Sequence, residues 1–502
     1  MQTIDFHAHL LSPEVEFSRI YDKVALTLFA KKLGVDKDEM IEKKYEAYEK
    51  SFINNIATST YVRKSVLLPV DAKVNTSGTE IFRDKTVCST NEDVYEVYKK
   101  FPNSVIPFMS INPNREDALD LIDTIPGNKC LIITDKNLVQ LGIVEILTKK
   151  LEESDKAWKI FDQVEPDPHE STVLKATEFC NDYNPDLIIG LGGGSSLDAA
   201  KAVWFLYEHK EDGYSIDDLN PFQEVHMGLK AKYLAIPTTS GTGAEATWAA
   251  IITRVDEDGN YLKLEQSHAD VIPTYAIIDP IFTKSLPQKL TVATGFDVIA
   301  HSCEGLISEW RNDMADACCL HALELVKEFF PRVFKDGNDM EAREKMANAA
   351  TLAGLGFGNS QVVMGHAMGH ALGAVFHLTH GITVGLMLPY VLEYSIGNPD
   401  DDTATKILGK AARKLGIAKW TENDKESAQN LIDYIKNLQK ELNFPTTLEA
   451  CGVTKEQLNS NMKRIVELTN ESASIAMSPR EPADEDIQRV IEYVFEGKSI
   501  DF

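Results

Sequence analysis

The stretch LIIGLGGGSSLDAAKAVWFLY, residues 187–207, predicts a buried strand that turns through glycines into a helix. The three glycines at 192–194 have no Cβ, so a phosphate can approach the backbone closely there. The free N–H groups and the positive end of the following helix favour an anion at the same place. Ser195 and Ser196 add hydroxyl donors or cap the helix. Alone, this turn fits a phosphate site and a ligand-free strand–helix connection equally well.

A second cluster of glycines and hydroxyls, IPTTSGTGAE at residues 236–245, follows another apolar strand. Two such loops at the carboxyl ends of strands in one sheet are where an open α/β fold binds nucleotides. Asp135 follows the apolar strand at 129–134. Its carboxylate can accept hydrogen bonds from a ribose 2′-hydroxyl and repel a 2′-phosphate, or it is an N-cap or turn residue.

Outward from these loops, the sequence changes character twice. Residues 1–123 and residues 124–285 both alternate apolar strands with helical patterns, which indicates βα units with parallel strands. From residue 286 to residue 502, amphipathic helical patterns joined by short Gly, Pro or Asn turns replace the strands. We therefore predict an α/β plus all-α fold with boundaries near Asp123 and Ser285.

Composition narrows the class of protein. The chain has 502 residues, 43% hydrophobic and 25% charged, without a stretch of about 18 apolar residues or a charged-then-apolar leader. We therefore expect a cytoplasmic globular protein without membrane contact. The net charge of −26, from 77 acidic and 51 basic residues, gives no attraction for nucleic acid. The seven cysteines include no CxxC pair, which fits a reducing compartment and argues against a thiolate metal site.

Two helical patterns carry candidate metal ligands. In residues 293–308, a carboxylate and an imidazole stand four apart, on one face of a helix. In residues 364–381, four of the twelve histidines gather among apolar residues and glycines. The side chains concerned are Asp297, His301, His366, His370, His377 and His380. A lone histidine on an apolar face is usually a core residue, but one Asp with three His suits Fe(II) or Zn.

Taken together, these motifs resemble the iron-containing (group III) alcohol dehydrogenase family over about residues 124–502. The motifs are TDK at 134–136, GGGSSLDAAKA at 192–202, IPTTSGTGAE at 236–245, TGFDVIAHSCEG at 294–305 and GHAMGHALGAVFHLTHG at 365–381. The resemblance implies a Rossmann-like NAD-binding domain at 124–285 and a helical, metal-binding catalytic domain at 286–502, with the active site in the cleft between them. It implies an NAD- and divalent-metal-dependent oxidoreductase that interconverts a small alcohol with its aldehyde or ketone by hydride transfer.

The resemblance also assigns site residues. The metal, Fe(II) or Zn, would be held by Asp297, His301, His366 and His380. His370 would be the catalytic histidine near the nicotinamide, relaying a proton. The cofactor would contact Asp135, Gly193, Gly194, Ser195, Thr238, Thr239, Thr242 and Lys263. In these assignments Gly193, Gly194 and Ser195 hold the pyrophosphate, Lys263 reaches a ribose, and Asp135 favours NAD over NADP. The substrate pocket would be lined by Trp248, Phe357 and His377.

Two departures from the family pattern stand out. Where the family often has Pro-Asn-Pro, this chain has Pro166-Asp167-Pro168, which adds a carboxylate near the ribose contacts. The family's N-terminal strand or hairpin, often used in subunit pairing, is replaced by residues 1–123. A homo-oligomer is therefore possible, but its formation through the family's usual N-terminal pairing is not expected.

Residues 1–123 resemble the opening of an amidohydrolase-2 type hydrolase or decarboxylase, in which an HxH pair, here His7 and His9, ends the first strand and binds a metal. About three βα units fit before Asp123, too few for a complete barrel, so we predict a barrel-like structural or interface module. The alternatives are hydrolysis or decarboxylation at this pair, a hydroxyacid–oxoacid transhydrogenase with tightly held NAD, and a non-catalytic scaffold.

Overall fold

The computed structural model describes residues 3–9, 62–68, 105–107, 119–256, 259 and 261–502. The chain divides into two compact units. One consists of Met1–Pro126, Lys149–Asp155 and Thr274–Ile277, and the other of Gly127–Thr148, Lys156–Pro273 and Ile278–Phe502.

In the first unit, three short strands form a parallel sheet in the order β1-β2-β3. Their bounds are Thr3–His9, Val62–Leu68 and Val105–Pro107. The predicted metal pair His7 and His9 belongs to β1, whose side chains lie outside the described part of the chain. Most of the predicted fragment at 1–123 also lies outside it, so its barrel-like character stays a prediction.

In the second unit, four parallel strands follow the order β7-β6-β4-β5. Their bounds are β4 Lys129–Ile133, β5 Ala157–Phe161, β6 Leu187–Gly192 and β7 Lys232–Pro237. Every residue of β6 is buried, which is typical of a central parallel strand covered on both faces. The connecting helices are α4 Lys136–Gln140, α5 Ile143–Glu153, α6 Glu170–Tyr183 and α7 Gly194–Glu208.

The strand order reverses between β4 and β6, because the chain runs outward to β5 on one side and to β7 on the other. Ligands of open α/β sheets bind at such a switch point, outside the carboxyl ends of the strands. The loops that leave β4 and β6 carry Asp135 and the glycine run, so the fold brings the predicted ribose-binding carboxylate and the first glycine loop to that switch point.

An antiparallel hairpin, not predicted from the sequence, follows the second glycine loop. It pairs β8 (Ala249–Val255) with β9 (Tyr261–Ser267). None of the residues of β9 is fully buried, and apolar and polar types alternate only from Leu262 to Glu265, so its apolar signal is weak. A last strand, β10, spans Tyr275–Ala276.

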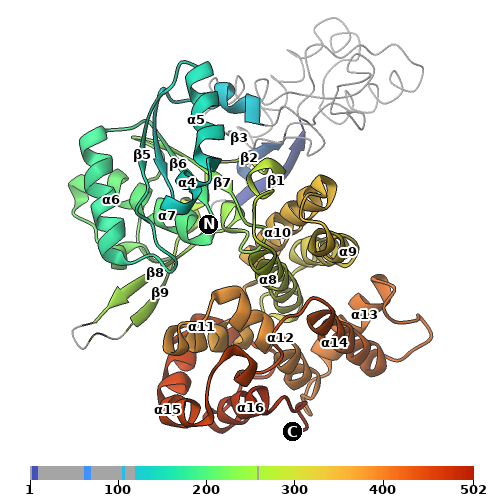
Figure 1. Ribbon diagram of the computed structural model, residues 1–502. Coiled ribbons are helices and arrows are strands. Elements are labelled where there is room, and N and C mark those ends of the chain that lie inside the picture. The colour runs from blue at the N-terminus through green and yellow to red at the C-terminus, as the bar shows by residue number, and fades with distance from the viewer. Residues whose placement is uncertain (1–2, 10–61, 69–104, 108–118, 257–258, 260) are drawn as a thin grey trace, which may run out of the picture. The chain divides into compact units, whose positions relative to one another are not determined.

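After the hairpin and β10, the described chain is helical, as predicted from residue 286 onward (Figure 1). The helices are α8 Gln288–Ile307, α9 Asp313–Lys335, α10 Met340–Ser360, α11 Met364–Phe376, α12 His380–Ile396, α13 Thr403–Lys414, α14 Asp424–Glu441, α15 Lys455–Glu471 and α16 Asp484–Glu496. Local signals define their starts: Asn312 caps α9 by accepting two backbone N–H groups, and Thr454 with Gln457 forms a capping box on α15. None of the helices in the described ranges combines the length and apolarity that a membrane span requires.

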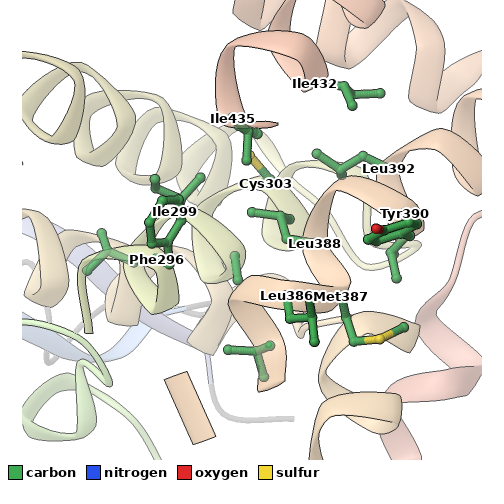
Figure 2. Close-up of a cluster of buried hydrophobic side chains, with 14 of the residues drawn as sticks. Phe296, Ile299, Cys303, Leu386, Met387, Leu388, Tyr390, Leu392, Ile432 and Ile435 are labelled. Carbon is green, nitrogen blue, oxygen red and sulfur yellow. The ribbon is translucent and has the colours of Figure 1, made fainter. Parts of the chain in front are cut away.

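Helix α8 is anchored in a buried core shared with α12 and α14 (Figure 2). The cluster includes Phe296, Ile299 and Cys303 of α8 together with Leu388 of α12 and Ile435 of α14. Because these side chains fix the orientation of α8, its polar residues are held on another face of the helix.

Candidate active site

The predicted metal ligands meet at one point. One ligand atom from each of four residues lies within 4.8 Å of the others; these residues are Asp297, His301, His366 and His380. Asp297 and His301 lie one turn apart on α8, His366 lies in the first turn of α11, and His380 begins α12. From Asp297 Oδ1, the distances are 3.7 Å to His301 Nδ1, 4.0 Å to His366 Nε2 and 3.4 Å to His380 Nε2.

Three of these atoms are buried without a hydrogen-bond partner among the described residues. They are Asp297 Oδ1, His301 Nδ1 and His366 Nε2. Buried polar atoms are costly to leave unsatisfied, and three that face one point are best explained by a bound cation. A carboxylate with three imidazoles fits Fe(II) or Zn, so these residues fit the predicted metal.

The protonation states of three of the four residues suit metal binding, whereas at His380 the lowering of the pKa by burial is outweighed by Asp297, which raises it. Burial would raise the pKa of Asp297, but the nearby histidines outweigh burial, and its pKa lies below the ordinary value. Burial lowers the pKa of His301 to about 3 and that of His366 well below the ordinary value. At neutral pH, Asp297 is therefore ionised and both imidazoles are neutral, which is the form that binds a metal.

Glu304 supports the cluster and was not predicted from the sequence. Its fully buried Oε1 lies 2.9 Å from His366 Nδ1, and its Oε2 accepts the backbone N–H groups of Val363 and His366. Burial raises the pKa of Glu304 to about 8, and through its two oxygens the carboxyl group orients His366 and caps α11 at the same time. The signal was present in the sequence, since Asp297, His301 and Glu304 stand at i, i+4 and i+7 on one helix face.

His370 lies one turn after His366, beside the cluster. Its ring centroid is 5.1 Å from that of His380 and 6.1 Å from that of His366. Its Nδ1 is 2.7 Å from Oε1 of Glu265, a residue of β9 that the sequence did not single out. Burial would raise the pKa of Glu265, but hydrogen bonds from His370 and Ser472 bring it below the ordinary value.

The two predicted phosphate loops face each other. A Cβ built on Gly194 would lie 2.8 Å from Thr242 Cγ2, and one on Gly193 would lie 3.2 Å from Thr239 Cγ2. Thr238 donates its N–H to Gly192 O across the strand ends. Side chains at the glycines would fill the space between the loops, so glycine keeps the backbone there accessible.

The predicted ribose contacts lie on separate elements: Asp135 follows β4, and Lys263 lies in β9. Asp135 Oδ1 accepts the N–H groups of Asn137 and Leu138 and caps α4, which is the alternative role that the sequence left open. Lys263 forms an ion pair with Asp167, the residue that departs from the family's Pro-Asn-Pro turn. The Asp167 N–H donates to Ser195 Oγ, which links this turn to the glycine loop.

The predicted substrate-pocket residues have different surroundings. Phe357 stacks on the His301 ring, with centroids 4.1 Å apart, and therefore lies against the metal cluster. Trp248 donates its ring N–H to Gly358 O, next to Phe357 along α10. His377 packs edge-on against Tyr261 of β9, with centroids 5.5 Å apart.

Comparison with known proteins agrees with this geometry. Two family models match the chain: "Iron-containing alcohol dehydrogenase" over residues 114–280 and "Fe-containing alcohol dehydrogenase family, C-terminal" over residues 291–495. The NADPH-dependent butanol dehydrogenase of Clostridium saccharobutylicum is 32% identical over 387 residues, which cover 77% of this chain and 96% of that protein. The chain belongs to the iron-containing alcohol dehydrogenase family and is an enzyme, an oxidoreductase.

Other relatives extend the comparison. The bifunctional aldehyde-alcohol dehydrogenase AdhE of Escherichia coli (strain K12) is 30% identical over 443 residues, which cover 84% of this chain and about half (49%) of that protein. A solved 1,3-propanediol oxidoreductase has a TM-score of 0.69 at 26% identity, covering 75% of this chain and 96% of the other. A sulfoacetaldehyde reductase from Bifidobacterium kashiwanohense, solved in complex with NAD+, has a TM-score of 0.64 at 26% identity, covering 76% and 95%. The amidohydrolase-like character predicted for residues 1–123 has no support in these matches or in the described strands.

Proposed function

We propose that the chain is an NAD-dependent, divalent-metal-dependent oxidoreductase that interconverts a small alcohol and its aldehyde or ketone by hydride transfer. The proposal rests mainly on three buried atoms that could ligate a metal and have no hydrogen-bond partner among the described residues. They belong to Asp297, His301 and His366, and His380 lies beside them. The glycine loops at the strand-order switch point support a dinucleotide as the second reactant.

Different residues are assigned to metal binding and to the exclusion of water. Asp297, His301, His366 and His380 would hold Fe(II) or Zn. A divalent ion, when bound, supplies a Lewis acid that lowers the pKa of a substrate hydroxyl, and the nicotinamide of NAD, when bound, takes up the hydride. Phe357 covers one face of His301 and excludes water from that side of the cluster.

His370 is the proposed proton carrier. Its side chain is 15% exposed, in contrast to 3% for His366, so it can exchange a proton with solvent. Its Nδ1 is engaged by Glu265, which leaves Nε2 to accept the proton of the alcohol.

The preference for NAD rests on Asp135 and Asp167. A carboxylate beside the ribose accepts hydrogen bonds from a 2′-hydroxyl and repels a 2′-phosphate. Asp167 forms an ion pair with Lys263, so the lysine charge is already neutralised and is not available to bind a 2′-phosphate. The butanol dehydrogenase relative is NADPH-dependent. Measuring which nucleotide this chain prefers therefore tests the roles proposed for Asp135 and Asp167.

The experiment measures reduction of NAD, and separately of NADP, against small primary alcohols and diols. It uses full-length protein loaded with Fe(II) or Zn, and the same protein after chelation. We expect metal-dependent NADH formation with a clear preference for NAD. Turnover that survives chelation would contradict the metal assignment. Turnover only when a second oxoacid is supplied would favour the transhydrogenase. None of the described residues points specifically to that activity.

A further inference from the structure

The structure assigns Glu265 as a positioning residue for His370: with Ser472, it fixes the ring orientation of that histidine and keeps the hydrogen on Nδ1. The contact joins parts of the chain that are far apart in sequence. Glu265 belongs to the β8–β9 hairpin, His370 to α11, and Ser472 follows α15.

The carboxylate of Glu265 is held from two sides. Its Oε1 lies 2.7 Å from His370 Nδ1. Ser472 Oγ, on a residue that is only 7% exposed, donates to the same carboxylate, at 3.0 Å from Oε1 and 3.1 Å from Oε2. A carboxylate clamped in this way cannot rotate freely, so it offers His370 a fixed acceptor.

The hydrogen bond determines the tautomer. An ionised carboxylate only accepts hydrogen bonds, so the hydrogen of a neutral imidazole must stand on Nδ1. The lone pair is then on Nε2. Without Glu265, the ring would be free to rotate about its side-chain bonds and to exchange the two tautomers, and Nε2 would hold the lone pair only part of the time.

The register of β9 gives the hairpin a double role. Lys263 and Glu265 stand two apart in a strand and therefore project from the same face, whereas Gln266 projects from the other. Lys263 meets Asp167 near the predicted ribose site, and Glu265 meets His370 beside the metal ligands. One strand face thus reaches both the nucleotide loops and the proton-carrying histidine.

The test uses the full-length chain loaded with Zn(II) and labelled with ¹⁵N-histidine. Long-range ¹H–¹⁵N correlation spectra report the tautomer of His370, identified by the signal that is missing in His370→Asn. We expect the Nδ1–H form in the parent and in Glu265→Gln, because the glutamine carbonyl can still accept that hydrogen. In Glu265→Ala, we expect exchange between tautomers. The matched control is Gln266→Ala, from the opposite strand face, which should keep the parent spectrum.

Kinetics give the second readout. Glu265→Ala should lower kcat roughly 10- to 100-fold with KM for the alcohol within about twofold, by analogy with the loss of a carboxylate that orients a metal-binding imidazole. Glu265→Gln should recover most of the rate, and Gln266→Ala should match the parent. An unchanged His370 tautomer in Glu265→Ala, or an equal rate loss in Gln266→Ala, would overturn the inference.

The role in proton transfer rests on the proposed function, whereas the tautomer does not. A parent protein that is inactive with every alcohol, yet shows the tautomer change in Glu265→Ala, would refute the proposed function and uphold the positioning role. If the parent is active but the tautomer of His370 is the same in Glu265→Ala, the proposed function is upheld and the positioning role of Glu265 is refuted.

Discussion

Glu304 holds one nitrogen of His366 while the other faces the metal site. Glu304 Oε1 lies 2.9 Å from His366 Nδ1, and His366 Nε2 lies 4.0 Å from Asp297 Oδ1, without a hydrogen-bond partner among the described residues. A carboxylate behind a metal-binding imidazole fixes the ring and increases its basicity. Glu304 therefore orients a candidate metal ligand without being a ligand itself.

The first prediction concerns this carboxylate. Glu304→Gln should weaken zinc affinity roughly 10- to 100-fold, because both oxygens of Glu304 accept hydrogen bonds and the amide has only one oxygen, so either the His366 ring or the α11 N-terminus loses its acceptor. Competition with a zinc-sensitive chromophoric chelator measures the affinity. Glu309→Gln, at an exposed position just beyond α8, is the matched control. Equal affinities in both variants and the parent would refute the supporting role of Glu304.

The second prediction concerns the nucleotide. Both hydrogen bonds that Asp135 makes to the α4 backbone end at Oδ1, and asparagine is an equally good helix cap. Asp135→Asn should therefore keep stability while it removes the negative charge. We expect the ratio of kcat/KM for NADP to that for NAD to rise about tenfold, equivalent to about 1.4 kcal/mol. An unchanged ratio would mean that Asp135 only caps the helix.

The grouping of the candidate metal ligands could be predicted from the sequence because helical periodicity brings residues four apart onto one face. Asp297 with His301, and His366 with His370, carry this local signal, and the structure brings the first pair, His366 and His380 together. Glu304 carries the same signal but was missed, because a glutamate in a helix is ordinarily a solvated surface residue.

Glu265 could not be predicted, because its partners lie 105 and 207 residues further along the chain. Its strand was missed for a related physical reason. The β9 residues are stabilised by pairing with β8 and by contact with α11, not by an apolar run of their own. Local propensity does not contain that information.

The third prediction concerns pH. Cys130 of β4 is fully buried, and burial raises the pKa of its thiol to about 12, against a small lowering by Lys156. Above pH 9, the thiol ionises in the unfolded chain and stays protonated in the folded one, so the unfolded state binds fewer protons and stability falls as pH rises. Each pH unit between about 9 and 12 should cost the parent about 1.4 kcal/mol through this group.

Thermal unfolding under reducing conditions between pH 8 and 10.5 checks this expectation against Cys130→Ala. The variant has a constant packing defect but no thiol to ionise at this position, so its stability should fall less steeply above pH 9. Other titrating groups cancel in the comparison. Parallel curves for parent and variant would contradict the prediction.

The fourth prediction concerns the contact between the second glycine loop and α10. A Cβ on Gly354 would lie 2.6 Å from Gly243 O and 3.0 Å from Gly243 Cα, and both are backbone atoms that have no rotamer to escape through. Gly243 itself has φ +61°, a conformation that favours glycine. Glycine to alanine within a helix ordinarily stabilises by about 1 kcal/mol. Here we expect Gly354→Ala to destabilise by about 1–3 kcal/mol instead, because the loop must move away from the helix.

Since loop 236–245 carries Thr239 and Thr242, its displacement should also weaken NADH binding, by about tenfold, while zinc content stays at the parent level. Gly358→Ala on the same helix is the matched control, because its Cβ would find no atom nearer than 3.8 Å. It should keep both stability and NADH affinity, or gain slightly in stability. If Gly354→Ala binds NADH as the parent does despite its lower melting temperature, the loop does not contact the nucleotide, and its threonines serve only to pack the glycine turn.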